Sequence, residues 1–438
     1  MTQDAFVEQI NSFSSRGVIL KRGNHAQVTP IPLAASLGSN RLTLLPTTTL
    51  STFFMDATPS LRNSLLRRMR WFDTTPEVKE FARNLLATNC LGNLEALNTD
   101  SGSEYFDLLV HVDPEAVMTT IHRLIGSLMS EELQQIVAGR RYLVWALEKL
   151  VFRRQGFDTA ATLLRRLATS ETEAGIANNA TGQFTQLYQL YLAGTEASPD
   201  MRLLVLDDGL RSPNQKERGV CIAALNRMLE TVHFSRVGGS EGIGSQSVLK
   251  DWAPSTYGEI WNFYRAALQR LTDIALGDDP FASQAKNIIG SHIRGLIGRL
   301  PFDEIKATIH CIVSHDGFWP EAVEKVNEWL YFDRKKAPKE LGQEVRAYFD
   351  ELMPSDPVEL AILYTNGWQA DFHDPDIDYD QEQASQHDFE YSTRKAIELA
   401  DVVSTNQNTI DRALDRFVTS QGRSVFPFAR RRNYQDLR

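Results

Sequence analysis

The sequence predicts an all-α protein, an irregular α-solenoid of helix pairs with a small, partial winged-helix hairpin at its N-terminus. The first observation is a recurring dipeptide in which Ser, Thr or Asp precedes a proline and an apolar helical run. The side-chain oxygen accepts hydrogen bonds from free N–H groups at a helix start, and proline suits the first helical turn. The second observation is a set of apolar residues that recur at three- and four-residue steps, which places them on one helix face. The seven dipeptides are Thr58-Pro59, Thr75-Pro76, Asp113-Pro114, Ser198-Pro199, Ser212-Pro213, Asp279-Pro280 and Asp356-Pro357.

The N-terminal part, residues 1–40, reads as a helix followed by a hairpin. An apolar stripe predicts a helix over 3–15, and the runs 18–22 and 25–29 predict two strands joined by a Gly-Asn turn. A helix followed by a hairpin is the second half of a winged-helix domain. Either this unit is minimal or the chain is the downstream part of a longer protein, and we favour the second interpretation.

Residues 41–370 form the predicted helical array, whose centre is the stretch 139–171. Two amphipathic helices follow each other there, broken by Gln155-Gly156. A helical hairpin of this kind cannot bury both of its faces alone, so it needs a neighbour on each side. The segment 199–231 is typical of a HEAT-type helix pair, whereas no strict repeat period is present. This pattern predicts HEAT- or TPR-like pairs with irregular spacing, interrupted by a long loop over 232–258.

Composition indicates a soluble cytoplasmic protein. The net charge is −10, which disfavours a whole-surface nucleic-acid binder but leaves a local basic patch open. The chain has three cysteines, an odd number, and each lies beside apolar residues in the sequence. We therefore expect Cys90, Cys221 and Cys311 to be reduced thiols in the core. No uncharged run reaches the roughly 18 residues of a membrane span, and the start lacks the pattern of a signal peptide.

An acidic linker is expected over 371–390, followed by a helical segment over 391–438 with a basic tail. The alternating aspartates from Asp374 imitate a calcium loop, but the required glycine and glutamate are missing in both registers. We therefore favour a solvated linker, with weak cation binding through His373 and His387 as the alternative.

Two further patterns imitate catalytic or nucleotide sites. The glycine-rich run 238–244 lacks the lysine that a phosphate loop needs, so a flexible connector is the favoured interpretation. Cys311 and His315 lie four residues apart in one predicted helix, whereas a catalytic pair normally comes from separate segments. We therefore expect no enzyme activity, no cofactor and no metal site in this chain.

The candidate binding residues are Arg140, Arg153, Arg154 and Arg165, which fall off the apolar stripes of the central helices. Stacked helix pairs would align them into a ridge bordered by the loop 232–258. Arginine forks suit carboxylates and phosphates, so a protein partner or ligand is expected on this solenoid face. The alternative is that these arginines only keep the array soluble.

The order of the parts resembles the region downstream of the ATPase core in large bacterial STAND-type NTPases. The segments that carry the resemblance are GVILKRGNHAQVTPIPLA, RRYLVWALEKLVFRRQGFDTAATLLRRLA, ANNATGQF, HFSR and KDWAPSTYGEIW. The resemblance implies a winged helix, helical repeats that sense a ligand or partner and, in some members, a role in anti-phage defence. The chain departs from that family because it has no phosphate loop, no Walker B motif and no effector domain. Any ATPase activity would have to come from an upstream region.

Two functions follow from these observations. The first is a non-catalytic interaction and sensor module, part or partner of a STAND-type NTPase. The second is a DNA-binding regulator that uses the N-terminal segment, with Arg16, Lys21, Arg22 and His25 on phosphates. Helix 3–15 carries acids but no Lys or Arg, which disfavours DNA binding. The sequence leaves the oligomeric state open.

Overall fold

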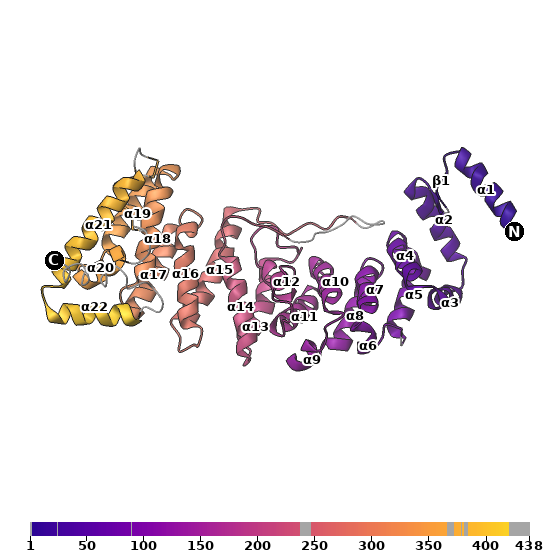
Figure 1. Cartoon of the computed structure of the whole chain (residues 1–438), viewed down its shortest axis with the longest axis horizontal. Helices are drawn as coiled ribbons and strands as arrows, with labels where there is room; N and C mark the ends of the chain where they lie inside the picture. The colour runs from indigo at the N-terminus through magenta and orange to yellow at the C-terminus, as the bar shows by residue number, and fades with distance from the viewer. Residues whose placement is uncertain are drawn as a thin grey trace, which may run out of the picture. The chain divides into compact units, whose positions relative to one another are not determined.

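The chain is mostly helical. The computed structural model describes residues 2–23, 25–88, 90–236, 247–365, 372–377, 379–380 and 384–419. These residues form 22 α-helices, two short 3-10 helices and one two-stranded sheet (Figure 1). The predicted all-α class is thereby confirmed. None of the helices in the described part of the chain combines the length and the apolar character needed to cross a bilayer.

The N-terminal segment follows the predicted order. Helix α1 (Gln3–Ser15) is capped by Thr2 and precedes strands β1 (Ile19–Arg22) and β2 (His25–Val28), which pair antiparallel. The next helix, α2 (Ile31–Thr43), was not expected, and it crosses the predicted boundary at residue 40. Its central Gly38 is a poor helix former, but the ring of Phe72 lies 2.6 Å from where a Cβ would be. The close packing of α2 against η1 (Arg70–Phe72) therefore explains why this helix contains a glycine.

Five of the seven predicted starts are confirmed, because a helix begins at the proline. The remaining two helices, α14 (Gln215–Met228) and α16 (Ala282–Leu296), begin two residues later. At α14 the amide oxygen of Asn214 accepts from the N–H groups of residues 216 and 217, so Asn214 takes the capping role assigned to Ser212. The confirmed starts belong to α4 (Pro59–Met69), α5 (Pro76–Ala87), α8 (Pro114–Ile125), α13 (Pro199–Leu210) and α20 (Pro357–Thr365).

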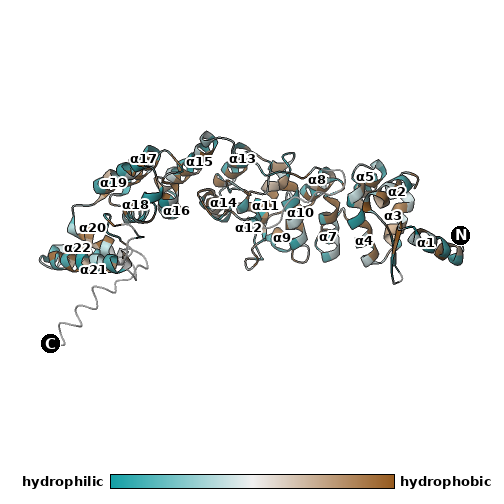
Figure 2. Cartoon of the chain, turned by 90° about the horizontal axis from the view of Figure 1, so that it is seen from above, coloured by the Kyte–Doolittle hydropathy of each residue, from teal (hydrophilic) through white to brown (hydrophobic). Residues whose placement is uncertain are grey.

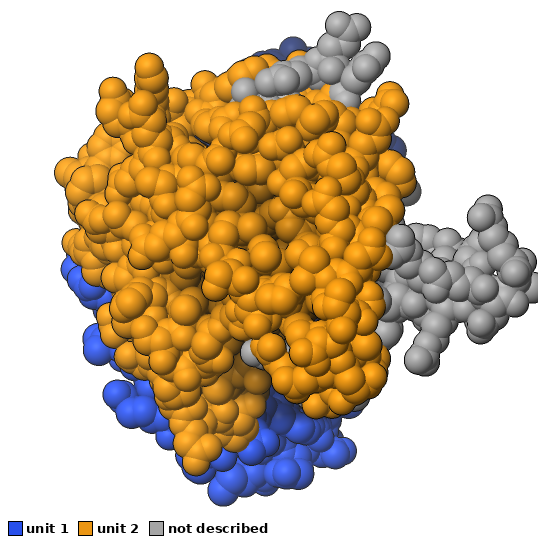
Figure 3. Space-filling view, turned by 90° about the vertical axis from the view of Figure 1, so that its left-hand side faces the viewer, with its two compact units in different colours: residues 1–224, 235–253 blue, residues 225–234, 254–438 orange. Residues whose placement is uncertain are grey.

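The chain folds into two compact units (Figure 3). The sequence did not indicate this division. Unit 1 comprises residues 1–224 and 235–253, and unit 2 comprises residues 225–234 and 254–438. The predicted array 41–370 is therefore shared between them. The other helices of unit 1 are α3 (Thr47–Asp56), α6 (Leu94–Leu97), α7 (Asp100–Leu109), α9 (Ser130–Gln134), α10 (Arg140–Phe152), α11 (Phe157–Thr169) and α12 (Ala180–Gln186).

The centre of unit 1 is the predicted helix pair, α10 and α11. Helix α10 packs between α7 and α11, and α11 also contacts α8, α12 and α13 (Figure 2). Leu143, Leu147 and Leu164 are fully buried, as the apolar stripes predict. Each helix of the pair thus has a neighbour on both sides, which is the arrangement that the sequence requires.

Unit 2 is built from helices that alternate between two layers. Helices α15, α17 and α19 contact one another in sequence, and α16, α18 and α20 do the same, while α15 also packs on α16. Val358, Ala361, Val403 and Ala413 form a separate small core among the last three helices. The helices not yet given are α15 (Tyr257–Ala275), α17 (Phe302–Asp316), α18 (Pro320–Phe332), α19 (Lys339–Leu352), α21 (Ala384–Val403) and α22 (Gln407–Thr419), with η2 (Arg334–Lys336) between α18 and α19.

The acidic stretch is not a solvated linker in its described part. Phe372 and Asp388 are buried, and α21 begins at Ala384, inside the predicted linker 371–390. The stretch packs because its aromatic and histidine residues meet aromatic residues of α18, which its acidic composition concealed. The predicted segment 391–438 contains the rest of α21 and α22, and its basic tail lies outside the described residues. The glycine run 238–244 does so as well, whereas the described ends of the loop 232–258 are not helical before Tyr257.

The cysteines differ from the expected core thiols. Cys221 is buried, Cys90 is half-buried and Cys311 is exposed, although it follows the buried Ile309 in an apolar run. The expectation for Cys311 was wrong because α17 buries only one face, and residue 311 lies on the other.

This difference gives a testable prediction about thiol reactivity. Burial raises the pKa of Cys221 to about 12, so its thiolate is scarce at neutral pH. We expect the native chain to label rapidly at Cys311 with iodoacetamide at pH 8 and to leave Cys221 unmodified until urea is added. Peptide mass spectrometry checks both sites. Rapid native labelling of Cys221 would contradict its buried position.

Candidate anion-binding site

The predicted arginine face does not exist as a surface, because two of its four members are buried. Arg140 is 0 % exposed and donates to the carbonyl oxygens of Leu133 at 3.1 Å, Leu167 at 2.6 Å and Ser170 at 2.9 Å. The Glu171 carboxylate lies 3.5 Å from its Nε atom. Burial lowers the pKa of Arg140, and Glu171 opposes that shift. Arg140 therefore joins α9, α10 and the end of α11, and the surface position that the sequence predicted for it was wrong.

Arg165 is likewise an internal residue. Its side chain is 5 % exposed and makes ion pairs with Asp208 at 2.5 Å and Glu217 at 2.8 Å. It also donates to the backbone carbonyl of Val205. Arg165 thus fastens α11 to α13 and α14, and its predicted exposure was wrong. An arginine beside an apolar stripe can reach the next helix, so its position off the stripe did not imply contact with solvent.

The other two predicted residues lie at the end of α10. Arg153 is half-buried at the C-cap, and Arg154 is exposed. The structure therefore retains Arg154 alone as a fully accessible member of the predicted ridge. Since one exposed arginine cannot form a ridge, the charged surfaces elsewhere in the chain are stronger candidates for binding.

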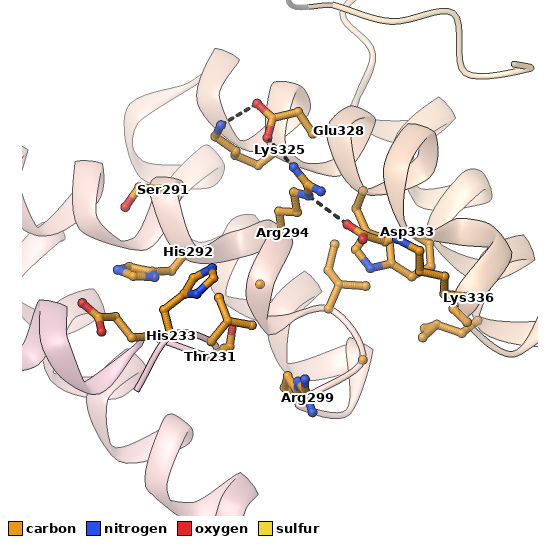
Figure 4. A pocket seen from close by; sticks show the side chains of 18 of the residues that line it. Thr231, His233, Ser291, His292, Arg294, Arg299, Lys325, Glu328, Asp333 and Lys336 are labelled. Atoms are coloured by element: carbon orange, nitrogen blue, oxygen red, sulfur yellow. Dashed lines mark hydrogen bonds and ion pairs between the residues drawn. The ribbon is translucent and has the colours of Figure 1, made fainter. Parts of the chain in front are cut away.

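A hollow lies in unit 2, at the ends of α14, α16 and α18. We call it the basic cleft; its volume is about 910 Å³. Its lining comes from the segment 227–233, the end of α16, the turn after it, α18 and the connection to α19 (Figure 4). Its charged and polar side chains are Arg227, Glu230, Thr231, His233, Ser291, His292, Arg294, Arg299, Lys325, Glu328, Asp333 and Lys336.

A glycine allows one wall of the cleft to approach the other. At Gly295 of α16, an added Cβ would lie 2.6 Å from Oγ1 of Thr231. A side chain at residue 295 would therefore displace the segment that follows α14. His233 in the same segment has a φ of 59°, which turns the chain beside the cleft.

Ion pairs hold most of the charged side chains of the cleft in fixed positions. Arg294 reaches between two carboxylates, with Nε 2.8 Å from Asp333 and Nη1 3.7 Å from Glu328 (Figure 4). Lys325 also pairs with Glu328, at 2.5 Å. Arg294 lies against the ring of Phe332, with its guanidinium carbon 4.6 Å from the centroid. The cations of this wall are therefore pre-positioned, which lowers the entropic cost of binding an anion.

The cleft carries more cations than its own carboxylates can neutralise. Five Lys and Arg residues line it, against three acids, and the three acids already engage Arg227, Arg294 and Lys325. Arg299 is exposed and has no ion pair among the described residues. Burial lowers the pKa of His292 to about 4, so this imidazole is neutral at pH 7 and adds hydrogen-bonding capacity rather than charge.

The geometry suits recognition of phosphate or carboxylate groups. Within the described ranges, no three His, Cys, Asp or Glu residues are grouped so that they could hold a metal ion. The alternative cation site at His373 and His387 consists instead of two His–Asp pairs, to Asp388 at 3.2 Å and to Asp374 at 3.1 Å.

Sequence reasoning missed the basic cleft because its residues come from segments more than 100 positions apart. The one available signal was the surplus of basic residues at the ends of predicted helices. Such residues are routinely explained by the helix dipole, so the signal was weak. No family model matches the sequence, and no curated protein resembles it closely enough to suggest a function.

Proposed function

We propose that this chain is a non-catalytic sensor module of helical repeats, whose ligand carries phosphate or carboxylate groups and binds in the basic cleft. The observation that carries the proposal is the cationic surplus of a preformed hollow in a chain of net charge −10. A positive hollow on an acidic protein concentrates anions locally.

The helix pairing in unit 2 supports the repeat interpretation. Alternate helices contact each other in two layers, as stacked helix pairs do in HEAT- and TPR-like solenoids. Binding surfaces of such arrays form where the ends of successive helices and their connections meet. The basic cleft lies at the ends of α14, α16 and α18 and at the connections that follow them.

The same proposal includes a cellular role. A helical sensor downstream of a winged helix is the arrangement that the sequence resemblance to STAND-type NTPases implies. In that setting, ligand binding to the cleft would be relayed to an upstream NTPase, with anti-phage defence as one such system and the cytoplasm as its location.

A DNA-binding role of the N-terminal hairpin is the second candidate. Lys21, Arg22 and His25 are exposed on its strands, which favours contact with phosphates. However, Nζ of Lys21 already donates to Asn11 at 2.8 Å, and α1 presents only Asp4 and Glu8 as charged side chains. A recognition helix without a cation repels the DNA backbone, so the sensor function is better supported.

Calorimetric titration of the full chain with tripolyphosphate and with citrate tests the proposal. We expect saturable binding of at least one anion at low salt. We further expect Arg299→Glu to weaken this binding by about tenfold or more, because it replaces a cation that has no ion pair among the described residues by an anion. Arg211→Glu, at an exposed arginine of unit 1, is the matched control and should bind as the wild type does.

Two outcomes would refute the assignment of this site. One is the absence of saturable binding of both anions. The other is equal affinity of Arg299→Glu and wild type. A mobility shift with a DNA duplex that persists in Arg299→Glu but is lost in Lys21→Glu/Arg22→Glu would favour the second candidate function instead.

A further inference from the structure

The described part of the acidic stretch, residues 372–377 and 379–380, lies on a basic surface of unit 2. We call this stretch the acidic segment, and we call Arg334, Lys335, Lys336 and Arg346 the η2 surface, since three of these residues form η2. The acidic segment and the η2 surface are in direct contact, in addition to carrying opposite charges. This arrangement is separate from the basic cleft, although Lys336 borders both.

The base of the acidic segment is firmly packed. Phe372 is 2 % exposed and meets the rings of Phe349 and Tyr364, with centroids 6.0 and 4.8 Å away. The buried amide of Asn327 accepts from the backbone N–H of His373 at 2.8 Å and donates to its carbonyl oxygen at 2.9 Å. The His373 ring is stacked on Tyr331 with centroids 3.9 Å apart. These contacts fix where the chain emerges beside the η2 surface.

The tip of the acidic segment contacts the η2 surface through four different groups. Arg334 donates to the carbonyl oxygen of Pro375 at 2.8 Å, and Arg346 pairs with Asp376 at 2.5 Å. Lys335 pairs with Asp380 at 2.6 Å. Lys336 places its ammonium 5.4 Å from the centroid of the Tyr379 ring. The surface thus contacts a backbone carbonyl, two carboxylates and an aromatic ring of one short peptide.

These tip contacts are of the kind that exchange readily. The side chain of Asp376 is 75 % exposed, and those of Lys335 and Asp380 are about half exposed. Ion pairs at such exposure contribute little to stability and weaken in salt. The packed base does not depend on them. The tip can therefore leave the η2 surface without unfolding the segment at Phe372 and His373.

One further cation, Lys339, lies beside the η2 surface and is not used by the tip. A hollow of about 740 Å³ lies there, lined by Arg334, Lys335, Lys339 and Arg346 together with Asp350 and Asp376. Lys339 has no ion pair within the described residues and is exposed. A longer acidic peptide could pair a carboxylate with Lys339, which the acidic segment does not contact through an ion pair.

We propose that the η2 surface is a docking site for an acidic, tyrosine-containing peptide segment of a partner protein, and that the acidic segment occupies it as an intramolecular pseudo-ligand. A peptide fits these contacts better than a nucleic acid does. Arg334 donates a hydrogen bond to a peptide carbonyl, and the two paired carboxylates, of Asp376 and Asp380, are four residues apart in one chain. The tethered tip competes at high effective concentration, so a partner binds only when it offers more contacts or when the tip is released.

Fluorescence anisotropy with a labelled peptide of residues 374–380, DPDIDYD, tests this proposal on the full chain. Asp376→Asn/Asp380→Asn removes both carboxylates of the tip and leaves the packed base unchanged. We expect this variant to bind the peptide about tenfold more tightly than wild type, because the internal competitor is weakened. Adding Lys335→Glu/Arg346→Glu to the same variant should abolish binding.

The matched peptide NPNINYN, in which every carboxylate is replaced by an amide, is the control and should not bind. Equal affinity of wild type and Asp376→Asn/Asp380→Asn overturns the pseudo-ligand, as does absence of binding to both. Equal binding of the acid and amide peptides overturns the charge recognition. Since all the substituted side chains lie at the surface, an unchanged melting temperature verifies the fold of each variant. Arg299 is not involved, so a failure here is distinguishable from a failure of the basic cleft.

Discussion

Leu147→Asp is expected to unfold the centre of unit 1. Leu147 is 0 % exposed in α10, which packs between α7 and α11. A carboxylate there is removed from water, and an unpaired buried charge costs several kcal/mol. A domain is stable by only about 5–15 kcal/mol, so this one change removes much of the total. Thermal melting followed by circular dichroism should show a melting temperature lower by at least about 10 °C.

Leu204→Asp provides the matched control, because Leu204 of α13 is 72 % exposed. The same substitution there is expected to change the free energy of unfolding by less than about 0.5 kcal/mol. Limited proteolysis should cut Leu147→Asp within α7, α10 and α11 at concentrations that leave Leu204→Asp intact. Equal melting temperatures for the two variants would mean that α10 does not pack as described.

Arg140→Met is expected to cost about 3–5 kcal/mol, although methionine fills a similar volume. The change removes the guanidinium donor from the carbonyl oxygens of Leu133, Leu167 and Ser170, of which Leu133 and Leu167 keep a backbone N–H donor. It also removes the cation beside Glu171. A buried polar group that loses its partner costs its full desolvation free energy. Urea denaturation should show a lower midpoint with an unchanged slope.

The control for this prediction is Arg154→Met, at the exposed end of α10. We expect a change within about 0.5 kcal/mol, because Arg154 has no comparable buried contacts. Comparing Arg140→Met with Arg154→Met tests whether Arg140 is a buried structural residue or a surface residue. If both variants were as stable as wild type, Arg140 would be a surface residue, as the sequence first indicated.

Most helix positions in this protein follow from local sequence. A capping oxygen followed by proline acts within one turn, so Thr58, Asp113 and Asp356 mark helix starts whatever the chain does elsewhere. The buried seam of α10 and α11 is also local, since its residues recur at three- and four-residue steps. The N-terminal hairpin was predictable for the same reason, because both strands lie within ten residues.

The role of the charged residues was decided by tertiary structure. Arg140 and Arg165 look like surface residues in their own helices, but carbonyl groups and carboxylates of neighbouring helices surround them. The acidic segment looks like a linker until Tyr331 and Asn327 of α18 are placed beside it. The basic cleft needs the end of α14 next to α16 and α18. A charge is favourable or costly according to what lies within a few ångströms of it, and only folding brings residues from distant parts of the chain to that distance.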